Sequence, residues 1–144
     1  MKVTLPIIIP SQRIADLMKG AIDNNPMTRV WCAGIVFKAA RINQCPINTA
    51  EELTGPSPWY ANPLLYDDQF LIEVHEILDD PALGSTRSTI RRHRVTHDDF
   101  AEAFKRMAHR DYARHLADFF KERDDTVTGG IFLQLVTFKV VVYG

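Results

Sequence analysis

The chain has 144 residues, a length that suits one domain with one hydrophobic core. Hydrophobic residues make up 46% of the chain and charged residues 24%, and this balance excludes an intrinsically disordered protein. The formal net charge of -1 excludes a protein that binds polyanions through its overall charge. We therefore expect a single domain over residues 1–144.

The first forty residues are predicted to contain two strands and a helix. Residues 3–9 are expected to form an edge strand, because a proline limits its hydrogen bonding. A helix is expected from Ser11, a good N-cap residue, to the Asn-Asn-Pro sequence at 24–26. Residues 30–40 are apolar and rich in β-branched and aromatic side chains. They indicate a second strand, with a β-bulge at Gly34.

A long proline-rich stretch, residues 43–69, is predicted to be a loop with one short helical turn at 49–53. Loops of this length inside a compact domain are often functional. This loop carries the aromatic residues Trp59, Tyr60 and Tyr66. Two interpretations stay open: the rings stack on a base of a ligand, or they pin the loop to the core.

The hairpin expected over residues 70–95 has unevenly distributed charge. Its first strand, 70–78, belongs to an acidic region without lysine or arginine. Its second strand, 88–95, carries three neighbouring arginines, Arg91, Arg92 and Arg94. In one interpretation, acids on the first strand pair with arginines on the second. In the others, the arginines hold a phosphate or carboxylate, or acidic and basic patches meet between subunits.

Two amphipathic helices are expected next. The first is expected to begin at Thr96, with Asp99 at the position of the acid in a capping box. Its buried stripe is predicted to consist of Phe100, Ala103, Phe104 and Met107. The second helix begins near Asp111. Its core-facing side chains are predicted to be Tyr112, Leu116, Phe119 and Phe120.

The ending, residues 130–143, is the most apolar part of the chain. Its residue types favour a strand, while the spacing of its apolar residues suits a buried helix, so both stay open. So much apolar surface predicts a homo-oligomer, or alternatively a central core element. Together the elements predict an α+β fold: a small antiparallel sheet with three to four helices packed on one face, and a long aromatic, proline-rich loop.

No set of residues in the sequence specifies a reaction, a metal site or a cofactor. Glu73, His75 and Glu76 resemble part of a nuclease strand, but the lysine and the spaced second acid of such a site are missing. His93 and His97 have a spacing known from zinc sites, yet they straddle a strand end and a helix cap. We therefore predict no catalytic residues, no metal ligands and no cofactor.

The cellular location follows from what the sequence lacks. Two cysteines are too few for a disulfide scaffold. The apolar patch near the N-terminus is shorter than the core of an export signal, and no apolar run reaches a membrane-spanning length. We expect a cytoplasmic protein that contacts no membrane.

The C-terminal segment 124–135, with its Asp/Thr-rich turn and Leu-Gln pair, and the Val-Tyr-Gly ending at 142–144 resemble a family of small proteins encoded by tailed bacteriophages and prophages. The motifs at 14–17 and 59–61 are similar too, so the resemblance covers most of the chain in scattered pieces. Gly130 stands where the family pattern usually has an acid. This departure argues against a catalytic acid in the segment.

The resemblance implies an accessory protein that acts inside a bacterium, in a family without an assigned enzyme activity. Such proteins commonly work by binding. We expect a non-enzymatic binding protein that counteracts host defence by binding a host protein or by sequestering a phosphorylated signalling nucleotide. The predicted ligand site consists of Arg91, Arg92, Arg94, Trp59, Tyr60 and Tyr66. The alternatives are a small metal-dependent enzyme acting on nucleic acid and an interaction module of the virion or its assembly.

Overall fold

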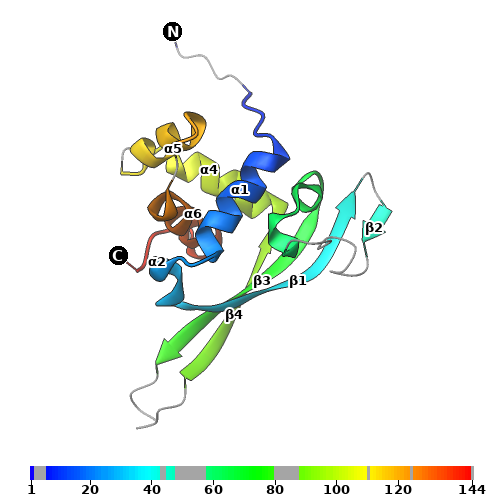
Figure 1. Ribbon diagram of the computed structural model, residues 1–144, viewed down its shortest axis with the longest axis vertical. Coiled ribbons are helices and arrows are strands. Elements are labelled where there is room, and N and C mark those ends of the chain that lie inside the picture. The colour runs from blue at the N-terminus through cyan, green and yellow to red at the C-terminus, as the bar shows by residue number, and fades with distance from the viewer. Residues whose placement is uncertain are drawn as a thin grey trace.

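The computed structural model describes residues 1, 6–42, 45–47, 58–79, 88–109, 111–123 and 125–143. The predicted α+β fold is confirmed: an antiparallel sheet carries a layer of helices on one face (Figure 1). In the described part of the chain, no helix lies over the opposite face (Figure 1). The sheet therefore has one face that is covered by helices and one face that is not.

Four strands form the sheet in the order β2-β1-β3-β4, and all neighbours are antiparallel. They are β1 (Cys32–Ile42), β2 (Cys45–Ile47), β3 (Phe70–Asp79) and β4 (Ser88–Thr96). The predicted hairpin is β3–β4, and its far end extends beyond the helices in Figure 1. The bulge expected at Gly34 is confirmed by a shift of register between Cys32 and Gly34.

The helical layer is built around α6 (Thr126–Phe138), which is surrounded by other elements (Figure 1). It contacts β4 and four helices, α1 (Ser11–Ile22), α2 (Pro26–Arg29), α4 (His97–Met107) and α5 (Ala113–Phe120). All residues from 128 to 137 are buried, so α6 has no polar face. None of the described helices is long and apolar enough to cross a bilayer.

The chain ending is therefore a helix followed by an extended tail. Asp125 caps the helix, because its Oδ1 accepts a 3.0 Å hydrogen bond from the backbone N–H of Thr128. Lys139 ends it in the left-handed conformation, with φ 69°. The tail folds back along α6, and the buried amide of Gln134 binds it through the backbone of Val142 and Tyr143.

The capping box of α4 is confirmed, since the backbone N–H of Thr96 donates a 2.8 Å hydrogen bond to Asp99 Oδ2. Its predicted stripe is buried as expected: Phe100, Ala103, Phe104 and Met107. In α5, Phe119 is buried, but the inward placement of Phe120 was wrong, because 48% of its surface is exposed. The two helices are separated by a tight corner and do not form one bent unit.

Two local predictions near the N-terminus were wrong. Residues 6–9 are not a strand: they lead into α1 without regular secondary structure, and the rest of that prediction lies outside the described residues. Ser11 is not the N-cap, because Pro10 holds that position and the Ser11 hydroxyl bonds the Asp67 carboxylate. The stretch 43–69 is not all loop, because it contains the strand β2, and its described part also forms two 3-10 turns, Trp59–Ala61 and Pro63–Tyr66. The helical turn expected at 49–53 lies outside the described residues.

Candidate functional site

The register of the β3–β4 hairpin divides the three predicted arginines between the two faces of the sheet. Arg92 lies opposite His75 and Arg94 opposite Glu73, whereas Arg91 lies opposite Glu76. Side chains alternate along a strand, so Arg92 and Arg94 share one face with His75 and Glu73. Arg91 belongs to the other face, which the helices cover. The structure therefore does not gather the three arginines around one ligand.

Arg92 and Arg94 lie on the surface without a helical layer, which we call the open face. Among its residues are Val36 and Lys38 of β1, Glu73, His75 and Ile77 of β3, and Ile90, Arg92 and Arg94 of β4. The side chain of Arg92 is 71% exposed and that of Lys38 is 45% exposed. Arg94 is exposed as well. Aliphatic side chains lie among these cations, since Val36 and Ile90 are 39% and 42% exposed.

Glu73 is the electrostatic centre of the open face. Its Oε1 lies 2.7 Å from His75 Nε2, 3.7 Å from Arg92 Nε and 3.9 Å from Lys38 Nζ. The hydrogen bond from His75, together with the nearby cations, lowers the pKa of Glu73 despite its partial desolvation. The predicted cross-strand pairing of acids with arginines is thus present at Glu73. Ion pairs that water reaches in this way contribute little to stability.

The internal pairing does not balance the charge around Glu73. Three cations, Lys38, Arg92 and Arg94, lie around its carboxylate, and the second acid that strand alternation assigns to this face, Asp79, is at the far end of β3. Around Glu73, one carboxylate offsets one of three positive charges, which leaves this part of the open face electropositive. Such a surface attracts an acidic partner and steers its approach.

The three predicted aromatic residues lie on the helix side of the sheet, away from Arg92 and Arg94. Trp59 packs against Phe37 with ring centroids 6.0 Å apart. The Tyr60 hydroxyl bonds the Asp23 carboxylate. Tyr66 is only 3% exposed, and its hydroxyl donates a 2.6 Å hydrogen bond to the carbonyl of Tyr60. These contacts support the interpretation in which the rings pin the loop to the core.

Glu76 lies on the covered face, so it does not converge with Glu73 and His75. It is 5% exposed and contacts His93 Nε2 at 2.9 Å and the Tyr143 hydroxyl at 2.6 Å. Burial alone would raise the pKa of Glu76, but the hydrogen bonds from Tyr143 and His93 outweigh it and lower the pKa. Alternation along the two strands places His93 and Glu76 on the same face, so this contact could be inferred from the sequence. Nothing in the sequence points to Tyr143.

The residues considered for metal binding are also separated. His93 packs edge-on against Phe138, whereas His97 packs against Phe70 at the start of α4. Within the described segments, no three histidine, cysteine or acidic side chains are placed to share a metal ion. The thiol of Cys32 is largely buried, and desolvation raises its pKa to about 11. A cysteine with this pKa is a packing residue at neutral pH.

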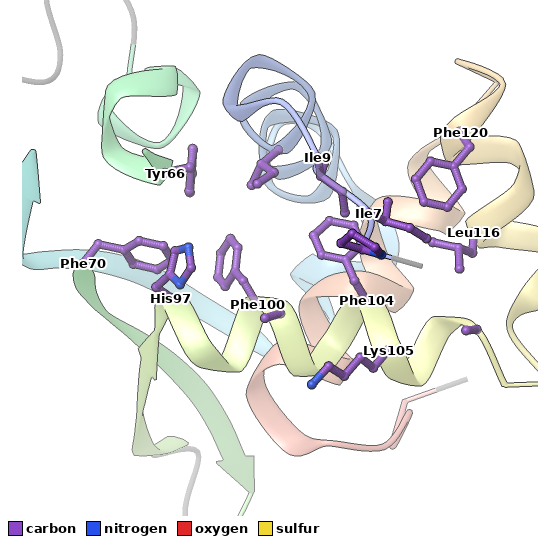
Figure 2. A pocket seen from close by; sticks show the side chains of 14 residues that line it. Ile7, Ile9, Tyr66, Phe70, His97, Phe100, Phe104, Lys105, Leu116 and Phe120 are labelled. Carbon is purple, nitrogen blue, oxygen red and sulfur yellow. The ribbon is translucent and has the colours of Figure 1, made fainter. Parts of the chain in front are cut away.

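An apolar pocket of about 550 Å³ lies on the helix side, between the N-terminal segment, α1, α4 and α5 (Figure 2). Tyr66 is one of its walls, and Phe100 and Phe104 of α4 form another. No sequence motif predicted this pocket. Its lining comes from five separate segments of the chain, and no local pattern connects them.

Comparison with known proteins found no match for the chain. No protein-family model matches it, and no curated protein or solved structure matches it either. The resemblance to small tailed-phage proteins therefore stays a prediction from sequence motifs. The function of the chain must therefore be inferred from the open face and the pocket.

Proposed function

We propose that the chain is a non-enzymatic binding protein of a tailed phage or prophage, which acts in the cytoplasm of its bacterial host. Its partner is an acidic surface of a host protein, held by the open face of the sheet. One observation carries this proposal: exposed Arg92, Arg94 and Lys38 surround the carboxylate of Glu73 on a sheet face that no described helix covers. Interference with host defence is the role that the viral resemblance suggests.

The chemistry of the open face favours a protein partner over a signalling nucleotide. A nucleotide site needs cations for the phosphates and a ring for the base within one small cavity. Here the ring of Tyr66 stacks on Phe100 on the other side of the sheet from Arg92 and Arg94. A protein interface instead combines exposed aliphatic side chains with separated charges. The open face has both, because Val36 and Ile90 are exposed on the same face as these cations.

Site-specific cross-linking tests the proposal in infected or lysogenic cells. A photoreactive amino acid at Ile90 lies on the open face, and the same group at Val127 marks the start of α6 in the helical layer. Both positions are exposed, so they form a matched pair. We expect a discrete adduct with one host protein from position 90 and none with that protein from position 127.

Charge reversal makes the test specific. Arg92→Glu combined with Arg94→Glu should abolish the adduct from position 90. Arg114→Glu combined with Arg123→Glu changes the net charge equally at exposed helix-side positions and should preserve it. Cross-linking that survives the first pair, or that position 127 shares, would refute the proposal.

Most of the apolar ending packs inside the chain itself, so it is weaker support for a homo-oligomer than the sequence suggested. Phe132 is fully buried inside the chain's own core, as the alternative interpretation required. In the ending, the large aliphatic side chains that remain on the surface are Val140 and Val142, which are 55% and 56% exposed. A homo-oligomer stays a prediction, and native mass spectrometry of the purified protein measures the number of subunits.

A further inference from the structure

We propose that the apolar pocket of Figure 2 is a binding site for a small amphipathic anion, a molecule with an apolar chain or ring and one acidic head group. The site lies among the helices and is independent of the open face. Its volume of about 550 Å³ falls within the 300–1,000 Å³ typical of small-molecule sites.

The inner part of the pocket suits an apolar body. Phe100 and Phe104 are 3% and 9% exposed, and Tyr66 is 3% exposed. Tyr66 and Phe100 are stacked with ring centroids 5.7 Å apart, which fixes the shape of this wall. Figure 2 shows Ile9 and Ile7 facing these rings from the N-terminal segment. A chain or ring inserted here would exchange water for aromatic and aliphatic contacts.

The mouth of the pocket is accessible. Ile7 is 68% exposed and Phe120 is 48% exposed, although both line the pocket. Ala101 of α4 is also an exposed lining residue. Large apolar side chains left in contact with water around a concave surface are typical of a binding site. A ligand that covers Ile7 and Phe120 would remove this unfavourable exposure.

The charge at the mouth selects the head group. Among the described lining residues none is acidic, and Lys105 is the one permanent cation. In Figure 2 the Lys105 nitrogen points away from the aromatic rings. The aliphatic stem therefore borders the pocket while the ammonium stays in water, an arrangement that suits a ligand whose acidic head remains at the surface. Burial of that head group is not required, so its desolvation cost is small.

Dodecanoate is a suitable probe, with dodecyltrimethylammonium as the matched cation of equal chain length. Isothermal titration with the full chain should give saturable one-to-one binding of dodecanoate and at least about tenfold weaker binding of the cation. Chemical shifts of the Ile7, Ile9 and Ile14 methyl groups should move with the titration, because all three line the pocket.

Two variants locate the site. Ala101→Phe places a ring at the mouth and should weaken dodecanoate binding at least about tenfold, whereas Ala117→Phe adds the same ring at an exposed position of α5 outside the pocket and should have no effect. Lys105→Glu should reverse the preference between the two probes. Circular dichroism verifies that each variant is folded. Absence of dodecanoate binding, equal effects of the two phenylalanine variants, or equal binding of the two probes would overturn the proposal.

Discussion

The phenolic hydroxyl of Tyr143 donates a 2.6 Å hydrogen bond to Oε2 of Glu76, 67 residues earlier in the chain. The Tyr143 ring also stacks on Trp31, with centroids 5.9 Å apart and planes within 7°. These contacts join the C-terminal tail to β3 and to the start of β1. The tail thereby covers part of the helix side of the sheet. The open face remains accessible.

Removal of the Tyr143 hydroxyl should weaken this closure without disturbing the ring stack. Tyr143→Phe is expected to lower the free energy of unfolding by about 1–3 kcal/mol, because a nearly buried carboxylate loses a hydrogen-bond donor. Urea denaturation measures the change. Tyr112→Phe is the control, since its hydroxyl has no hydrogen-bond partner among the described residues. Equal losses in the two variants would contradict this role of Tyr143.

The stability of the protein should depend on pH through Glu76. Its pKa is lowered below the ordinary 4.5 in the folded state, so the carboxylate contributes stability that is complete above pH 4.5 and lost as the pH falls through the folded pKa. Glu76→Gln removes this contribution. Urea midpoints measured from neutral to acidic pH should therefore fall more steeply for the unmodified chain than for the variant.

The comparison between the two chains isolates Glu76 from other acids. Asp99 and Asp125 also have lowered pKa values, but they are present in both chains and contribute the same slope to each. Parallel curves for the unmodified chain and Glu76→Gln would show that Glu76 does not contribute to the acid sensitivity.

Gln134 should hold the tail in place. Its Oε1 accepts hydrogen bonds of 2.9 and 2.8 Å from the backbone N–H groups of Val142 and Tyr143, and its Nε2 donates a 2.8 Å bond to the Tyr143 carbonyl. Gln134→Leu should abolish the protection of both amides against hydrogen exchange and cost about 1–3 kcal/mol of stability.

A second polar residue of α6 provides the comparison. The Thr137 hydroxyl bonds the Leu133 carbonyl within the same helix, so Thr137→Val should leave the tail amides protected. If Val142 and Tyr143 remain protected in Gln134→Leu, the tail is held by other contacts.

Two glycines at the α1–α6 contact should respond in opposite directions to alanine. A Cβ at Gly129 would lie 2.8 Å from the backbone nitrogen of Ala21 and 3.0 Å from its Cα, and these atoms belong to a packed helix. Gly129→Ala should therefore destabilise the chain by about 1–3 kcal/mol. A Cβ at Gly20 meets no atom within 4 Å, so Gly20→Ala should stabilise α1 by about 0.5–1 kcal/mol. Thermal melts of both variants measure the signs, and a shift in the same direction would contradict this packing.

Local sequence chemistry predicted the fold where a single segment contains all the information. The hairpin follows from two alternating strands around a turn, and the capping box of Thr96 and Asp99 follows from their spacing. The ending was undecided because α6 is buried on every side. A helix without a polar face has no amphipathic period to distinguish it from a strand.

The candidate site was predicted only in part, because it depends on register and on distant contacts. Successive side chains of a strand point to opposite faces of the sheet. Arg91 therefore lies on the face opposite to that of Arg92 and Arg94. The aromatic residues of the loop pack on the core, where the ring of Tyr66 stacks on that of Phe100. The two residues are far apart in the sequence, so no local pattern predicts this contact. The pocket is assembled from distant segments and has no signal in the sequence.

The affinity of the open face for the host protein cross-linked at position 90 tests the central claim most directly. At low salt, Arg92→Glu with Arg94→Glu should weaken binding at least about tenfold, mainly through slower association, and the difference should shrink as the salt concentration rises. Arg114→Glu with Arg123→Glu should remain within about twofold of the unmodified chain. Equal affinity of the Arg92 and Arg94 double variant and the unmodified chain at low salt would contradict the account.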